Sequence, residues 1–137
     1  MTVSECLEEA RETMLYLREK TDDYRMAELQ SKNPLKRDLD SMVLGLDEKR
    51  QELDQLAQEA AIKGKRAYAI IGTLDNPRLK EAMWSYYASG LTEGAAMKRG
   101  HFRSRDEMRK AIALGISEIE KMIMEYKKAR EGRECLN

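Results

Sequence analysis

The apolar residues of the first half of the chain recur at alternating spacings of four and three residues, which is typical of long helices rather than of strands. A first run of these positions lies on one helix face: Val3, Leu7, Ala10, Met14, Leu17, Thr21 and Tyr24. A second run follows: Leu39, Met42, Leu46, Lys49, Leu53, Leu56, Ala60, Lys63, Ala67, Ile70 and Leu74. No stretch alternates apolar and polar residues for long enough to form a strand. The sequence therefore predicts an all-α fold.

A short break separates the two helical runs. Pro34 cannot continue a helix and disfavours helix at the residue before it, so we expect the first helix to end near Ser31. The two apolar helix faces, which we call seams, are joined by a short linker. They predict an antiparallel, coiled-coil-like helical hairpin, a stalk over residues 1–74. The alternative is that the seams pair between two chains in a homodimer, and the spacing alone favours neither arrangement.

Helix-capping residues divide residues 75–130 into three helices. Side chains that cap helix N-termini stand at three points: Asn76 (followed by Pro77), Thr92 and Ser104. Glycines that suit helix C-termini follow the first two helices: Gly90 and Gly100. Ser104 and Glu107 form a capping box, which predicts the start of a long helix. A short helix, a turn with glycine and a capped helix predict a helix-turn-helix domain, and residues 131–137 form a C-terminal tail.

The predicted recognition helix begins after Ser104 in the most basic part of the chain. Six Lys or Arg residues fall within residues 98–110, against Asp106 and Glu107. We predict that this region binds double-stranded DNA through eight residues: Lys98, Arg99, His101, Arg103, Ser104, Arg105, Arg109 and Lys110. Arginine at the start of such a helix can pair with guanine in the major groove, and the flanking cations can contact phosphates. The alternative is a solvated helix face that the two acids partly neutralise.

Composition and motifs exclude several classes of function. No apolar run is long enough to span a bilayer, and the acidic N-terminus is unlike a secretory signal, so we expect a cytoplasmic protein with no membrane partner. Cys6, Cys135 and the single histidine, His101, form no recognisable metal-ligand or nucleophile spacing, and no role is assigned to the cysteines. No phosphate-loop motif occurs. We expect no enzyme activity, catalytic residue, metal or cofactor.

The net charge of zero conceals an acidic first half and a basic second half. Residues 1–60 contain 9 Lys or Arg and 15 Asp or Glu, whereas residues 61–137 contain 16 and 10. Such a chain carries either two functional surfaces or one internally neutralised pair. An acidic stalk attached to a basic helix-turn-helix domain predicts DNA binding that is weak and strongly dependent on salt.

A family resemblance covers most of the chain. The residues that carry it are Ile70, Ile71, Leu74, Leu79, Tyr86, Thr92, Glu93, Ala96, Gly100, Arg105, Arg109, Ala113 and Leu114. On the basis of these residues, positions from about 66 to 121 resemble region four of bacterial sigma factors. More narrowly, they are similar to a family of small phage and prophage proteins in which a coiled-coil-like N-terminal half precedes such a domain. The resemblance implies control of the transcription of phage or mobile-element genes, through DNA or through RNA polymerase.

Two functions from different classes follow. The first is a non-enzymatic DNA-binding transcriptional regulator. The second is a phage-encoded protein–protein interaction module, an inhibitor of a host complex such as RNA polymerase or a defence nuclease. In that case an acidic helical surface meets a basic groove of the partner through five residues: Asp22, Asp23, Glu52, Asp54 and Glu59.

Overall fold

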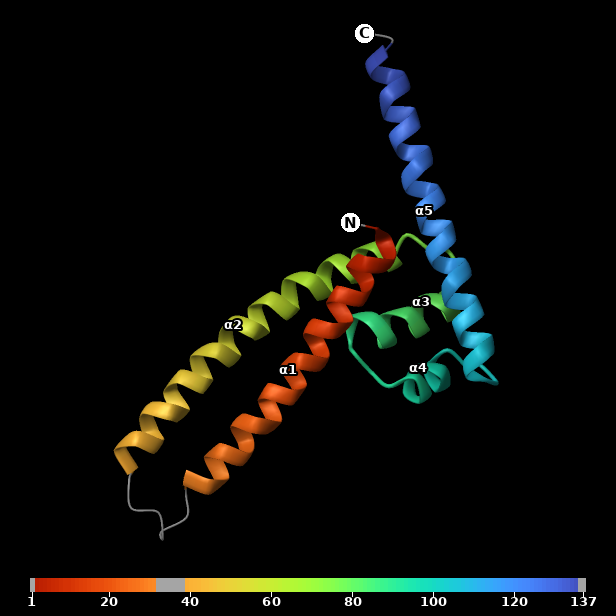
Figure 1. Cartoon of the computed structure of the whole chain (residues 1–137). Coiled ribbons are helices and arrows are strands. Elements are labelled where there is room, and N and C mark those ends of the chain that lie inside the picture. The colour runs from red at the N-terminus through yellow and green to blue at the C-terminus, as the bar shows by residue number, and fades with distance from the viewer. Residues whose placement is uncertain (1, 32–38, 136–137) are drawn as a thin grey trace.

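The computed structural model describes residues 2–31 and 39–135, and the side chains of residues 2–30 and 45–133. Its elements follow in this order (Figure 1): α1 (Val3–Ser31), α2 (Leu39–Ile71), α3 (Pro77–Met83), the π-helical turn η1 (Trp84–Ala88), α4 (Glu93–Arg99) and α5 (Arg105–Cys135). Helices contain 112 of the 127 described residues, and these residues contain no strand. The prediction of an all-α fold is confirmed.

The two long helices α1 and α2 lie side by side and run in opposite directions within one chain (Figure 1). All seven positions of the first apolar run, from Val3 to Tyr24, are buried or half-buried. In the second run Ala60 and Ala67 are buried, whereas Lys49 is exposed. The side chains of two further members lie outside the described residues: Leu39 and Met42. The spacing of apolar residues thus identifies the packed face of α1, and of α2 over its second half.

Lys63 occupies a position of α2 where the repeat would place an apolar residue. Its Nζ lies 2.8 Å from Glu9 Oε1 on α1 and 2.7 Å from Glu59 Oε1 on α2, and it donates a hydrogen bond to Thr13 Oγ1. The hydrogen bonds to Glu59 and then to Glu9 raise the pKa of the Lys63 ammonium. A charge in the seam is therefore paired across the two helices instead of interrupting their contact.

Local capping starts α3, α4 and α5 where the sequence predicts. Each N-cap side chain accepts backbone N–H groups: Asn76 from Arg78 and Leu79, Thr92 from Ala95, and Ser104 from Glu107. After η1 the chain turns through Gly90, whose φ of 63° is a left-handed conformation that glycine adopts without strain. The capping predictions at Asn76, Thr92 and Ser104 are confirmed.

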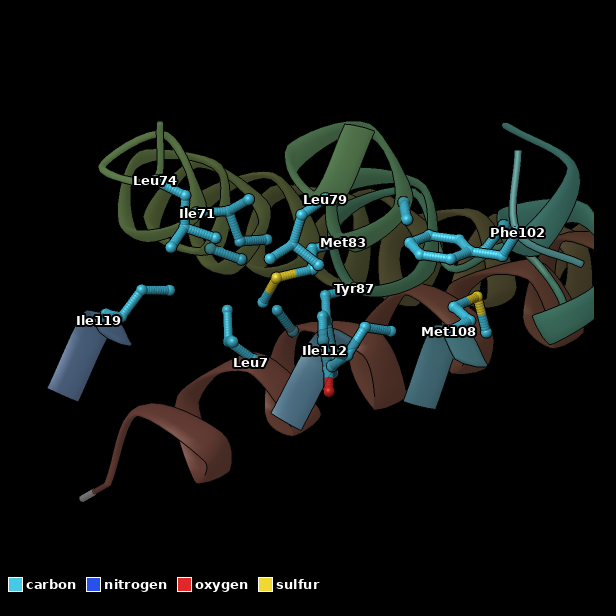
Figure 2. Packing of buried hydrophobic residues seen from close by; sticks show 14 residues of the cluster. Leu7, Ile71, Leu74, Leu79, Met83, Tyr87, Phe102, Met108, Ile112 and Ile119 are labelled. Atoms are coloured by element: carbon cyan, nitrogen blue, oxygen red, sulfur yellow. The ribbon is translucent and has the colours of Figure 1, made fainter. Parts of the chain in front are cut away.

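One buried cluster connects the α1–α2 pair with residues 75–119, which we call the head. Its members are Leu7, Ala10, Ala67, Ile71, Leu74, Leu79, Ala82, Met83, Tyr87, Ala96, Phe102, Met108, Ile112 and Ile119. Figure 2 shows the side chains of this cluster. The predicted domain boundaries at 74/75 and 130/131 stay predictions. The cluster contains residues from both sides of the first, and α5 continues past the second.

Two arginines of α1 bind the backbone where η1 ends. Arg11 and Arg18 donate to four carbonyl oxygens of the head: those of Tyr86, Ser89, Gly90 and Leu91. The Arg11 guanidinium also lies 3.7 Å from the centroid of the Tyr86 ring. Carbonyls at the end of a helix lack intrahelical partners, so these charged donors satisfy groups that would otherwise need water. The contacts tie α1 to the head.

Aromatic packing ties α2 to the head in the same way. The rings of Tyr68 on α2 and Trp84 on η1 are stacked, with centroids 4.4 Å apart and planes inclined by 14°. Trp84 Nε1 donates to the backbone oxygen of Tyr68 at 3.1 Å. The single tryptophan of the chain therefore lies at the junction between α2 and the head.

Candidate nucleic-acid interface

The predicted DNA-binding residues gather where α4 meets α5, at the end of α5 opposite its projecting C-terminal half (Figure 1). All eight are exposed: Lys98, Arg99, His101, Arg103, Ser104, Arg105, Arg109 and Lys110. They come from the last turn of α4, the connection over residues 100–104, and the first two turns of α5. The structure thus brings the predicted residues together on one accessible part of the head.

The turn after α4 has a geometry that the sequence did not predict. His101 N–H donates to the carbonyl of Lys98, and Phe102 N–H donates to that of Met97, the two hydrogen bonds of a Schellman motif. The left-handed residue of this motif is His101, with φ of 56°, although glycine usually occupies that position. The preceding Gly100 serves close packing instead, since a Cβ there would lie 2.5 Å from the Phe102 ring.

Arg78 of α3 binds the backbone of this turn, and the sequence analysis did not identify it. Its Nε donates to the carbonyl of Gly100 at 2.7 Å, and one of its terminal nitrogens, Nη2, donates to that of His101 at 2.9 Å. The guanidinium carbon lies 4.1 Å from the centroid of the Phe102 ring, and Nη2 lies 3.1 Å from Glu107 Oε1. Arg78 follows an N-cap asparagine and a proline, and no local pattern distinguishes it from a solvated cation.

The capping box at the start of α5 differs in one respect from its predicted form. Ser104 Oγ accepts the N–H of Glu107, as expected. Glu107 Oε2 accepts the backbone N–H of Arg103, one residue earlier than the usual partner, at 2.9 Å. This hydrogen bond, followed by the one from Arg78, lowers the pKa of the Glu107 carboxyl below its ordinary value of 4.5.

We expect Glu107→Gln to reduce the loss of stability that accompanies acidification. Because the folded state lowers the pKa of Glu107, its carboxylate stabilises the protein above pH 4.5, and this contribution disappears as pH falls through the folded-state pKa. Urea unfolding at a series of pH values from neutral to acidic measures the effect. Glu48→Gln, at an exposed glutamate of α2, is the control. Equal pH dependence in Glu107→Gln and the wild type would contradict the expectation.

Arg109 is bound within the head. Its Nη2 lies 2.8 Å from Glu93 Oε2 at the start of α4, and its Nη1 lies 4.0 Å from Asp106 Oδ1. The hydrogen bond to Glu93 is the main reason that the pKa of the Arg109 guanidinium is raised. Since Arg109 joins α4 to α5, charge reversal at this residue would place a third carboxylate beside Glu93 and Asp106 and would disturb the packing of the two helices.

The remaining cations differ in whether an acid lies near them. Arg99 Nη1 lies 3.9 Å from Glu81 Oε1. Among the described residues, no acidic side chain lies within 4.0 Å of the charged groups of four others: Lys98, Arg103, Arg105 and Lys110. Lys110 also lies on the face of α5 opposite the buried Met108 and Ile112, because successive helical residues turn by about 100°.

The acids predicted to meet a protein partner are only partly brought together. A cleft of about 720 Å³ opens between α1 and α2, and Asp23, Glu52 and Glu59 are among its lining residues. Asp22 and Asp54 are exposed but do not line it. Tyr16, Tyr24, Met26, Leu53 and Leu56 supply the apolar part of its walls. The cleft combines acidic groups with apolar surface, although Lys20 and Lys49 also reach it.

The described part of the chain contains no candidate metal centre. No three His, Cys, Asp or Glu side chains within it are grouped so that they could hold a metal ion. Cys6 is a half-buried free thiol, and the side chain of Cys135 lies outside the described residues. No helix in the described ranges is long and apolar enough to cross a membrane. No family model matches this chain, and no curated protein or solved structure matches it either.

Proposed function

We propose that this protein is a non-enzymatic DNA-binding regulator of transcription in a phage or mobile element. It binds through a sigma region 4-like helix-turn-helix that consists of α4, residues 100–104 and α5. The observation that carries the proposal is a group of four exposed cations whose charged groups lie within 4.0 Å of no acidic side chain among the described residues: Lys98, Arg103, Arg105 and Lys110. The resemblance to phage proteins with sigma-like domains supports the regulatory role.

The proposed contacts follow from where each cation lies. Arg105 is the first residue of α5, so it reaches DNA together with the positive end of the helix dipole. Lys110 lies on the outward face of the same helix, and the Lys98 and Arg103 side chains flank it as phosphate contacts. Arg109 is a positioning residue that holds α4 against α5 through Glu93. Base recognition therefore depends on Arg105 more than on Arg109.

Fluorescence anisotropy with random-sequence duplex DNA, titrated at low and at physiological salt, tests this function. We expect the wild type to bind, with affinity that falls steeply as salt rises because phosphate contacts release counterions. The double variant Arg105→Glu/Lys110→Glu should bind at least about tenfold more weakly, and its slope of log K against log salt should be shallower by about 2. A carboxylate at the first position of a helix suits the helix dipole, so α5 itself should persist.

The control is Lys65→Glu/Arg66→Glu, which makes the same change in net charge at two exposed residues of α2. If this control weakens binding as much as the head variant does, then net charge governs binding and the assigned surface is wrong. Absence of binding by the wild type at low salt would contradict DNA binding altogether.

The cleft between α1 and α2 supports a second candidate, the protein-interaction module of the first section. Three of its five predicted acids line this cleft beside apolar side chains, a combination that suits a basic amphipathic helix of a host protein. The variant Asp23→Lys/Glu52→Lys separates the two functions. It should release a bound protein under this candidate, whereas under the first it should leave DNA binding intact.

A further inference from the structure

The C-terminal half of α5 stands apart from the rest of the protein. Figure 1 shows it projecting beyond the α1–α2 pair and the head. Every described residue from Glu120 to Arg133 is exposed, whereas Met108, Ile112 and Ile119 in the first half are buried. A helical segment of about this length is marginal in water without tertiary contacts. A partner that covers its apolar side would therefore stabilise this segment.

The apolar face that packs the first half of α5 continues into the projecting half. Ile119 is 1% exposed, and the next residues on that side, Met122 and Ile123, are each 38% exposed. Tyr126 follows with 69% exposure, Arg130 takes the next position on this line, and Ala129 lies beside it on the same edge as Met122. The spacing of three and four residues is the same as that of the packed seams of α1 and α2. A surface suited to another helix is thus left uncovered.

The charge pattern along this segment indicates which kind of helix would cover its apolar face. Residues 118–125 contain three acids, Glu118, Glu120 and Glu125, and one base, Lys121. Residues 127–133 contain four bases and one acid: Lys127, Lys128, Arg130, Arg133 and Glu131. Two parallel copies would place acids against acids and bases against bases. Two antiparallel copies would place the acidic part of each against the basic part of the other.

We infer that the C-terminal half of α5 pairs with the same segment of a second copy of this chain in an antiparallel, twofold-symmetric coiled coil. Ile123 then faces Tyr126 of the second copy, and Met122 lies near its Ala129. Glu120 and Lys127 are seven residues apart and lie on one side of this seam, so Glu120 pairs with Lys127 of the second copy. The twofold axis repeats each of these contacts. Within one chain α1 and α2 pack on each other, whereas no described residue covers this face of α5.

Sedimentation velocity of the full chain over a wide concentration range tests the pairing. We expect a reversible monomer–dimer equilibrium in the wild type. Lys127→Glu should raise the dimer dissociation constant by about tenfold or more, because the twofold axis doubles the effect of each lost ion pair. Glu120→Lys should have a similar effect. The double variant Glu120→Lys/Lys127→Glu should restore most of the affinity by exchanging the two charges.

Lys128→Glu is the matched control, since it makes the same charge change one residue along, on the side away from the seam. It should leave the dissociation constant within about threefold of the wild type. Ile123→Glu should give a monomer, and far-UV circular dichroism of each variant shows that the helices persist. A wild type that stays monomeric overturns the inference. So does equal weakening by Lys127→Glu and Lys128→Glu, or a failure of the charge exchange to restore pairing.

Discussion

Ile71→Ala is expected to lower the free energy of unfolding by about 2–5 kcal/mol, because it leaves a cavity in a fully buried site. Ile71 is the last residue of α2, and none of its surface is exposed. It belongs to the cluster that contains Leu7 of α1, Met83 of α3 and Ile112 of α5 (Figure 2). The loss should therefore weaken the α1–α2 pair and the head together rather than one of them.

Urea unfolding followed by two probes measures this effect. Far-UV circular dichroism reports mainly on the long helices, and the fluorescence of Trp84 reports on its contact with Tyr68 of α2. Coincident transitions are expected if the pair and the head unfold as one unit. The matched control is Ile62→Ala on the same helix, where the side chain is 55% exposed and the cost should be below about 0.5 kcal/mol. Equal costs at the two positions would contradict the assignment of Ile71 to the shared core.

Gly100→Ala is expected to lower the free energy of unfolding by about 1–3 kcal/mol through overpacking. A Cβ at residue 100 would lie 2.5 and 2.7 Å from two atoms of the Phe102 ring and 2.9 Å from the Cβ of Ala82. The ring cannot move freely, since the Arg78 guanidinium lies against it and is bonded to the Gly100 carbonyl. The substitution should displace the turn that carries His101 and Arg103, so it should also weaken DNA binding.

Gly94→Ala makes the same chemical change but is expected to raise the free energy of unfolding. Gly94 lies in α4, and a Cβ there would meet nothing within 4 Å. Alanine should then stabilise the protein by up to about 1 kcal/mol, because it restricts the unfolded chain and favours helix. Thermal unfolding of both variants distinguishes the two effects. Stabilisation by Gly100→Ala would show that the turn is packed less closely than the structure indicates.

Much of the fold is determined by short-range patterns. The packed face of α1 follows from the spacing of residues such as Leu7 and Ala10, because a helix repeats every 3.6 residues and buries one side. The starts of α3, α4 and α5 follow from Asn76, Thr92 and Ser104, whose side chains bind backbone groups two or three residues away. Interactions of such short range can be predicted from residues that are close together in the sequence.

The sequence predicts where the candidate site lies, but not which of its cations form ion pairs. The concentration of cations between Lys98 and Lys110 is visible in the sequence, and the structure leaves all of them exposed. The sequence does not distinguish Arg109, which is paired with Glu93, from Arg105, whose guanidinium forms no ion pair with the described acidic side chains. That difference depends on how α4 crosses α5, and packing of the whole head sets the crossing.

The sequence by itself determined the helical class, the packed faces, the caps and the basic end of the head, because each depends on residues within a few turns of one another. Only the tertiary structure decided how these parts are joined. Arg11 binds the carbonyl of Tyr86, 75 residues away, and Arg78 binds that of Gly100, 22 residues away. Both side chains satisfy backbone oxygens left without helical partners, and which arginine reaches which oxygen depends on the three-dimensional approach of segments that carry no mutual pattern in the sequence.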